Sequence, residues 1–156
     1  MTSGQFLQRA VELSQEGMRQ GQGGPFGALV VAGGEIIGQG CNRVLATHDP
    51  TAHAEIVAIR QACQVRQSFS LPDGVIYTSC EPCPMCLSAI YWAGIQTVYY
   101  ANTRHDAAGI GFIDEELYGE LARAPEQRRL SMVRMLLPEA LAAFEEWRTK
   151  ADKVRY

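Results

Sequence analysis

Apolar positions in the first twenty residues recur at helical spacing. They fall every three or four residues, so that a helix over this stretch would carry one apolar face. These positions are Phe6, Leu7, Ala10, Val11, Leu13 and Met18. The run GQGG at 21–24 then ends the periodic stretch with glycines. The pattern predicts an amphipathic first helix.

Two short apolar runs follow and flank a glycine turn. GALVV and EIIGQG are rich in residues that favour strands, and Ala32, Gly33 and Gly34 separate them. Glycines between two such runs favour a tight antiparallel connection. The sequence therefore predicts a β-hairpin here.

Strands and helices alternate along the rest of the chain. We expect a second helix in TAHAEIVAIRQAC, with Thr51 as its cap directly after Pro50. A third helix, CPMCLSAIYWA, has Pro84 in its first turn, where the missing N–H would have no partner. The remaining predicted elements are the strands GVIYTS, IQTVYYA and SMVRMLL and a closing helix from Pro138 to about Lys150. Such alternation predicts an α/β fold with helices on both faces of one sheet.

Composition and charge narrow the class of protein. The 156 residues, 47% of them hydrophobic and 20% charged, contain no repeat and fit a single globular domain. No basic leader and no apolar run of about 18 residues is visible, so we expect a cytoplasmic protein without a membrane segment. The net charge of −3 argues against nucleic acid as a partner, because phosphate binding depends on clustered positive charge.

The cysteines favour metal binding over disulfides. The chain has five of them, an odd number without a secretion signal, which indicates reduced thiols. Cys83 and Cys86 form P-C-x-x-C at the start of the predicted third helix, where residues three apart share a face. His53, at the start of the predicted second helix, would be a third ligand. One imidazole and two thiolates suit a single Zn²⁺ ion, and three protein ligands leave the fourth tetrahedral position open for water.

Cys80 offers an alternative metal site. With His53, Cys83 and Cys86 it would complete a closed Cys₃His site, which is a structural staple without chemistry. Cys80 precedes the helix and is separated from Cys83 by Glu81 and Pro82, so we expect it to point along the end of the third strand instead.

Glu55 follows His53 by two residues, as H-x-E. A carboxylate in the first turn of a helix often serves the helix dipole or a capping box. With Thr51 as the cap, however, the capping-box position would be Ala54 and not Glu55. A glutamate beside a zinc ligand can instead take a proton from the attacking water and deliver it to a leaving group.

Together, His53-Ala54-Glu55 and Pro82-Cys83-Pro84-Met85-Cys86 resemble the H-x-E…P-C-x-x-C signature of the zinc-dependent cytidine and nucleobase deaminases. The likeness extends to GGPFGALVV, DPTAHAEIVAIR, YTSCEPCPMCLSAIYWA, the segment at Gly111–Asp114 and the terminal Trp147–Tyr156. Over nearly the whole chain, these segments are similar to the bacterial guanine deaminases of that family.

The resemblance implies a cytidine-deaminase-like α/β/α sandwich with a five-stranded mixed sheet, one Zn²⁺ per subunit and a homodimer that exchanges the C-terminal segment, about 138–156. By similarity, Asn42 would bind the base, Asp114 would bind its N–H edge and move protons, and Tyr156 of the partner subunit would complete the pocket. The resemblance also implies substrate contacts for Phe26, Ala54 and Trp92. Two positions depart from the family pattern. Ile113 stands where an aspartate is common, and Ser88 where a glycine is common.

Each pocket assignment has a simpler explanation. Asn42 could be a turn residue bonded to its own backbone, and Asp114 could be the N-cap of the helix DEELYGEL. Phe26 and Trp92 could be core aromatics, and Tyr156 could belong to a frayed terminus.

The activity that the resemblance implies is hydrolytic deamination of guanine to xanthine and ammonia, with Glu55 as proton carrier, a step of purine catabolism or salvage. Because the zinc motif fixes the reaction but not the ring, deaminases of cytosine or another aminated heterocycle and of adenosine in transfer RNA remain alternatives. A zinc-stapled binding module, closed by Cys80, is the alternative that is not an enzyme.

Overall fold

The computed structural model describes residues 1–156, which divide into two units, Met1–Tyr118 and Gly119–Tyr156. Helix α1 (Ser3–Arg19) opens the first unit and confirms the predicted first helix. Its cap is a reciprocal capping box. Thr2 Oγ1 accepts from the Gln5 backbone N–H, and Gln5 Oε1 accepts from the Thr2 N–H at 2.8 Å.

The predicted hairpin is confirmed. Strands β1 (Gly27–Ala32) and β2 (Glu35–Cys41) pair antiparallel across a two-residue turn. Gly33 and Gly34 have φ angles of 60° and 83°, in the left-handed region that a side chain disfavours. Two such residues form the type of turn that matches the twist of the flanking strands, so the glycines fix the hairpin.

Two further strands complete a mixed sheet. Strands β3 (Val75–Cys80) and β4 (Thr97–Asn102) confirm the predicted third and fourth strands. The order is β2-β1-β3-β4, with β1 antiparallel to β2 and β3, and β3 parallel to β4. The sheet therefore has four strands, and the expectation of five is wrong for this chain.

The missing fifth strand was expected at SMVRMLL, residues 131–137. This stretch is not a strand, and its apolar side chains are exposed, with Val133 and Met135 at 80% and 85%. A strand needs a neighbour for its backbone groups, and a β-prone sequence without one stays irregular. Strand β4 remains the edge of the sheet.

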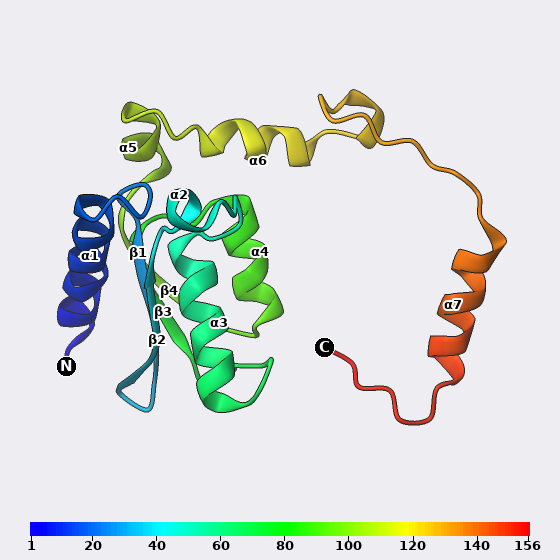
Figure 1. Ribbon diagram of the computed structural model, residues 1–156, viewed down its shortest axis with the longest axis horizontal. Helices are drawn as coiled ribbons and strands as arrows, with labels where there is room; N and C mark the ends of the chain where they lie inside the picture. Colours follow the sequence, from blue (N-terminus) through cyan, green and yellow to red (C-terminus); the bar gives the residue numbers. More distant parts are fainter. The chain divides into compact units, whose positions relative to one another are not determined.

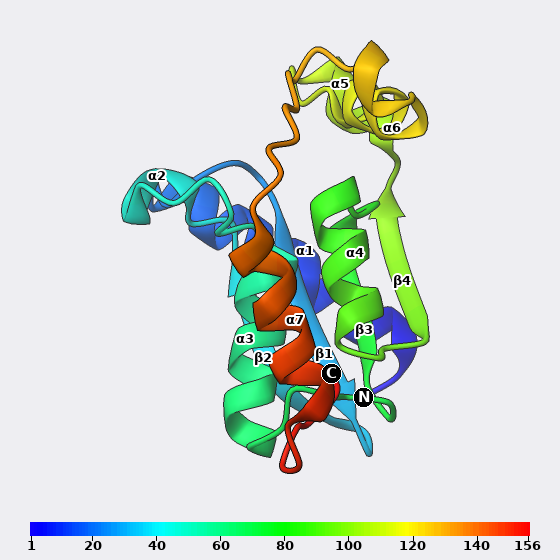
Figure 2. The same ribbon diagram turned by 90° about the vertical axis from the view of Figure 1, so that its right-hand side faces the viewer.

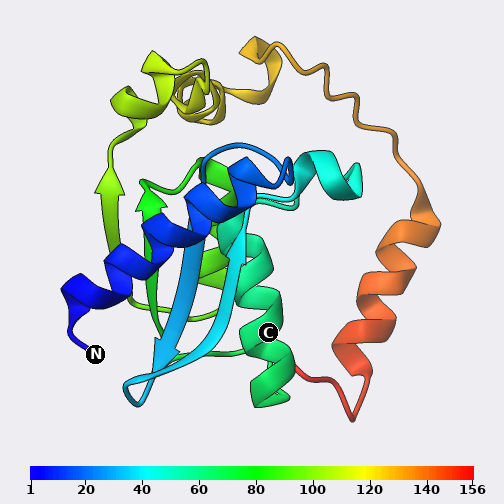
Figure 3. The ribbon, with the colours of Figure 1, turned by 60° about the vertical axis from the view of Figure 1, so that its left-hand side comes forward.

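Helices cover both faces of the sheet, as expected of an α/β/α sandwich (Figure 1). On one face α1 contributes Phe6, Ala10 and Leu13, which pack with Leu29, Val31 and Tyr77. On the other face α3 (Ala54–Arg66) and α4 (Pro84–Trp92) pack on Ala28, Val30 and Ile76. Successive residues of β1 thus alternate between two cores, which is why the whole strand is buried. Figure 2 shows α3 and α4 side by side on their face, and Figure 3 shows the hairpin behind α1.

The chain has five further helical elements. They are α2 (Val44–Thr47), α5 (Arg104–Gly109), α6 (Asp114–Ala122), a 3₁₀ turn (Pro125–Gln127) and α7 (Pro138–Thr149). Helix α7 confirms the predicted closing helix. None of the helices has the length and apolar character needed to cross a membrane.

Candidate metal centre and active site

Three predicted ligands meet where α3 and α4 begin. The ligand atoms of His53, Cys83 and Cys86 all lie within 4.8 Å of one another. His53 Nδ1 is 3.6 Å from Cys83 Sγ and 3.5 Å from Cys86 Sγ. One nitrogen and two sulfur donors at this separation fit a single Zn²⁺ ion and leave one tetrahedral position for water or substrate.

Both helices begin at a ligand. His53 is the N-cap residue of α3 and Cys83 that of α4, and neither side chain makes a capping hydrogen bond. The expectation that Thr51 caps the second helix is wrong. Asp49 Oδ1 accepts from both the Thr51 N–H and the Thr51 hydroxyl, at 2.8 and 2.7 Å, so Thr51 belongs to a turn before the helix. Pro84 occupies the first turn of α4, as predicted.

The electrostatics favour a thiolate at Cys83, whereas the hydrogen bond to Cys83 and burial raise the pKa of the Cys86 thiol. A hydrogen bond from Cys86, with a further one from His53, lowers the pKa of the Cys83 thiol to about 4. The hydrogen bond to Cys83 raises the pKa of the His53 ring. Free N–H groups at the start of α4 add to the stabilisation of negative sulfur.

Cys80 does not belong to the metal group. Its thiol points to the Thr103 carbonyl oxygen at 3.5 Å, and burial raises its pKa to about 11. Because its sulfur lies outside the group of three ligand atoms and faces the Thr103 carbonyl oxygen, the closed Cys₃His site lacks its fourth member.

Glu55 is buried beside the metal group, in the first turn of α3. Burial raises the pKa of its carboxyl, and the Thr78 hydroxyl donates to its Oε1 at 3.4 Å. With His53 as the N-cap, the capping-box position of α3 would be Ile56, so Glu55 has no capping role. A buried carboxylate with a raised pKa is suited to accept a proton and to return it.

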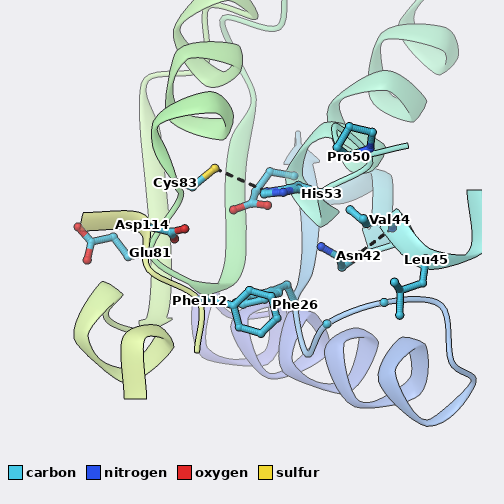
Figure 4. A pocket seen from close by; sticks show the side chains of 13 residues that line it. Phe26, Asn42, Val44, Leu45, Pro50, His53, Glu81, Cys83, Phe112 and Asp114 are labelled. Carbon is cyan, nitrogen blue, oxygen red and sulfur yellow. Dashed lines mark hydrogen bonds between the residues drawn. The ribbon is translucent and has the colours of Figure 1, made fainter. Parts of the chain in front are cut away.

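A cavity of about 370 Å³ opens over this group (Figure 4). Six residues predicted for the site line it: Phe26, Asn42, His53, Glu55, Cys83 and Asp114. Phe26 and Phe112 form an edge-to-face pair at 4.8 Å between ring centroids, and they make an aromatic wall. In Figure 4, Cys83, Asp114 and Glu81 lie on one side of the cavity and Asn42, His53 and Pro50 on the other. A planar ring of purine size fits a cavity of this volume.

Asn42 and Asp114 hold fixed places in the wall. Asn42 is buried, and its Oδ1 accepts from the Val44 backbone N–H at 3.2 Å, so the predicted turn interaction exists together with the cavity position. The remaining amide N–H groups are donors. Asp114 is the first residue of α6, and burial raises the pKa of its carboxyl.

Three predicted site residues lie elsewhere. Ala54 is fully buried in the core between His53 and Glu55, and it does not line the cavity. Trp92 ends α4 with 69% of its surface exposed, and it also lies outside the cavity lining. Tyr156 belongs to the second unit.

Several lining residues were not singled out from the sequence. They are Gly23, Gly24, Val44, Leu45, Pro50, Glu81 and Phe112. The two glycines stand in the run GQGG, where a turn explains them equally well. The others are single apolar or charged residues in loops, and no spacing marks them.

Comparisons with known proteins agree with this geometry. The family described as the cytidine and deoxycytidylate deaminase zinc-binding region matches residues 1–102. The guanine deaminase of Bacillus subtilis is 50% identical over 151 residues, 97% of each chain. Its X-ray structure superposes with a TM-score of 0.97 at 49% identity, and covers 100% of this chain and 99% of that one. A tRNA-specific adenosine deaminase of Aquifex aeolicus is 36% identical over 105 residues, 67% of this chain and 69% of its own. The ligand group, the buried glutamate beside it and these matches together show that the chain belongs to the cytidine and deoxycytidylate deaminase family of zinc enzymes.

Proposed function

We propose that this chain catalyses the hydrolytic deamination of guanine to xanthine and ammonia. The observation that carries the proposal is one cavity in which the buried Glu55 and the open three-ligand metal group face Asn42 and Asp114. The full-length similarity to a guanine deaminase favours guanine as the ring.

His53, Cys83 and Cys86 would hold the metal. A zinc ion here supplies Lewis-acid activation of water, whose pKa it lowers toward about 7. All five cysteines of the chain are free, which suits a reducing compartment such as the cytoplasm and keeps the two ligand thiols available.

Glu55 would carry the protons. Its carboxylate takes one proton from the attacking water as the new C–O bond forms at C2, the amino-bearing carbon of guanine. It then delivers this proton to the ring nitrogen beside C2. A second transfer moves the proton of the new C2 hydroxyl to the amino group, so that the C–N bond breaks, ammonia leaves and the C2 carbonyl forms. Burial raises the pKa of the Glu55 carboxyl, so its ionised and protonated forms lie closer in free energy. The ionised form accepts the proton and the protonated form donates it, so both transfers benefit.

The rest of the cavity would orient the base. The free amide N–H groups of Asn42 suit acceptor atoms of the ring, while Asp114 suits its N–H edge and can share in proton transfer. Phe26 offers a flat apolar contact to the ring plane. Ile113 is half exposed and does not line the cavity, so the departure from the family pattern leaves these contacts in place.

We also propose that the chain works as a homodimer that exchanges its C-terminal segment, residues 138–156. Within the second unit, Leu136 and Phe144 are among many apolar side chains left exposed. Within the first unit, β4 is an open edge, and an apolar cavity of about 440 Å³ lies beside α4 and β4. Monomeric proteins rarely expose this much apolar surface. If a partner's segment packed on α4 and β4, its apolar side chains and the apolar cavity would both be covered. Such an arrangement would also place Tyr156 and the exposed Trp92 at a subunit boundary, where the family resemblance implies their substrate roles, but it leaves Ala54 in the core.

Two defective chains test the exchange. Glu55→Gln keeps an intact C-terminus, and deletion of Tyr156 keeps an intact Glu55. If the segment is exchanged, co-expressed chains form heterodimers in which one cavity has both groups, and ammonia release returns. A mixture as inactive as its parents contradicts exchange, and full activity of the deletion variant alone removes Tyr156 from the site.

Ammonia release by the zinc-loaded protein tests the reaction. Guanine, cytosine, adenine and an RNA hairpin with an unpaired adenosine are assayed in parallel. Release from guanine alone supports the proposal. Release from another substrate would support zinc-dependent deamination but assign a different ring as the substrate. Release from none of the four would favour the zinc-stapled binding module. The net charge of −3 makes the RNA the least favoured of the four.

A further inference from the structure

A ring of contacts closes around the loop before Cys83. The Arg104 backbone N–H donates to Glu81 Oε2 and its Nε to Glu81 Oε1, each at 3.0 Å. The Arg104 guanidinium lies over the Tyr118 ring, 4.1 Å from its centroid. The Tyr118 hydroxyl in turn donates to the Pro82 carbonyl oxygen at 2.9 Å. Glu81, Arg104, Tyr118 and Pro82 thus form one closed circuit.

This circuit joins two segments on one side of the active site, the loop before Cys83 and helix α6, which are far apart in the sequence. Pro82 is covalently bonded to the metal ligand Cys83, and Glu81 lines the cavity. Tyr118 lies on α6, whose first residue is Asp114. Residues four apart on a helix share a face, so the bond from Tyr118 to Pro82 turns the Asp114 face of α6 toward the metal loop. Figure 4 shows Asp114 beside Cys83 and Glu81.

The residue types suit a rigid link. The guanidinium is planar, binds a carboxylate through two N–H groups and stacks on an aromatic ring, whereas a lysine offers only a mobile point charge. Arg104 and Glu81 are both sheltered, at 30% and 19% side-chain exposure. The ion pair also balances the negative charge of Glu81. Without Arg104, this charge would be a third unpaired carboxylate in a cavity that already holds Glu55 and Asp114.

We propose that Tyr118, stacked on Arg104, is a positioning residue that sets the Asp114 carboxylate against the metal ligands. The inference rests on the proposed deamination, and it gives that reaction a residue outside the cavity lining. Tyr118 acts through Asp114, by holding the first turn of α6 at a fixed distance from Cys83.

Tyr118→Phe tests this role, because it keeps the ring under Arg104 and removes only the hydroxyl bond to Pro82. We expect kcat for guanine to fall about tenfold with KM within about twofold, since a small misplacement of a proton-transfer group slows the chemical step. The matched control is Tyr77→Phe, which loses a tyrosine hydroxyl bond to Ser3 at 3.3 Å, away from the site. Its kcat should stay near that of the unaltered protein.

A double-mutant cycle separates positioning from general stability. In an Asp114→Asn background, Tyr118→Phe should cause no further fall in kcat, because the group that it places is already lost. The cobalt(II)-loaded variant should keep the thiolate absorption bands of the unaltered protein, which shows that the metal ligands have not moved. Equal falls in both backgrounds, no fall in either, or altered cobalt bands would each overturn the proposal. An unaltered protein that releases no ammonia from guanine overturns the proposed function itself, and the inference with it.

Discussion

The Gly23 backbone lies directly against the Asn42 side chain. A Cβ added to Gly23 would be 2.1 Å from Asn42 Oδ1 and 2.9 Å from the Asn42 carbonyl oxygen, closer than such atoms approach. Asn42 Oδ1 also accepts a hydrogen bond from the Val44 N–H. Glycine at position 23 therefore lets the amide keep its place in the cavity wall.

Gly23→Ala should weaken substrate binding. The methyl group must push the Asn42 amide away, and the loss of one buried hydrogen bond of about 1.4 kcal/mol corresponds to a tenfold rise in KM for guanine. Steady-state kinetics measure it, with zinc content as the check that the metal site is intact. Gly4→Ala in α1, whose Cβ would meet only Thr2 Oγ1 at 3.9 Å, should leave KM unchanged. An unchanged KM for Gly23→Ala would remove Asn42 from base binding.

Loss of either thiolate should remove the metal. Cys83→Ala and Cys86→Ala each leave two ligands, too few for tight zinc binding at this kind of site. Cys80→Ala keeps all three and should retain one ion per chain. Elemental analysis of the purified variants decides between the outcomes. Zinc loss from Cys80→Ala would restore the closed-site alternative.

Glu55→Gln should keep zinc and lose turnover. The amide is close in size to the carboxylate but cannot accept the proton, and general acid–base groups contribute about 10²–10⁴-fold to rate. Ammonia release and zinc content are measured on the same sample. Glu35→Gln, an exposed change at the start of β2, should behave as the unaltered protein. Retained activity with bound zinc would assign the proton transfer to another group.

Gly38→Ala should destabilise the fold. A Cβ at this position in β2 would lie 2.2 Å from the Ala58 carbonyl oxygen and 2.7 Å from the Ala62 nitrogen, both in the backbone of α3. Forcing the helix away from the strand costs about 1–3 kcal/mol of unfolding free energy. Urea denaturation measures the change against Gly109→Ala, whose Cβ meets nothing within 4 Å. Equal stability of the two variants would show that α3 tolerates the shift.

Local patterns account for what the sequence predicts well. The stripe of α1, the glycine turn, H-x-E and P-C-x-x-C are each encoded within a short stretch of the chain, and each is present in the structure. The two motifs lie 30 residues apart, but each has a characteristic spacing of its own. The cap of α3 was misassigned because Asp49, two residues before Thr51, binds the hydroxyl that a cap would need.

Features that depend on distant partners were not predictable. The stretch 131–137 has the composition of a strand, but a strand also requires an edge to pair with, and sequence periodicity does not supply one. The bond between Tyr118 and Pro82 spans 36 residues and has no characteristic spacing, so nothing in the sequence linked Tyr118 to the motif that contains Pro82.

The absence of a side-chain cap on α3 and on α4 links metal supply to the lifetime of the protein. Helix α3 begins at His53 and helix α4 at Cys83, so one ion bound by both residues would tie down two helix ends that would otherwise fray. An ion that binds only the folded chain stabilises it in proportion to the logarithm of its concentration. Under zinc starvation the starts of these two helices would open first, and proteases would reach the chain there, so the cell would lose the protein together with its activity.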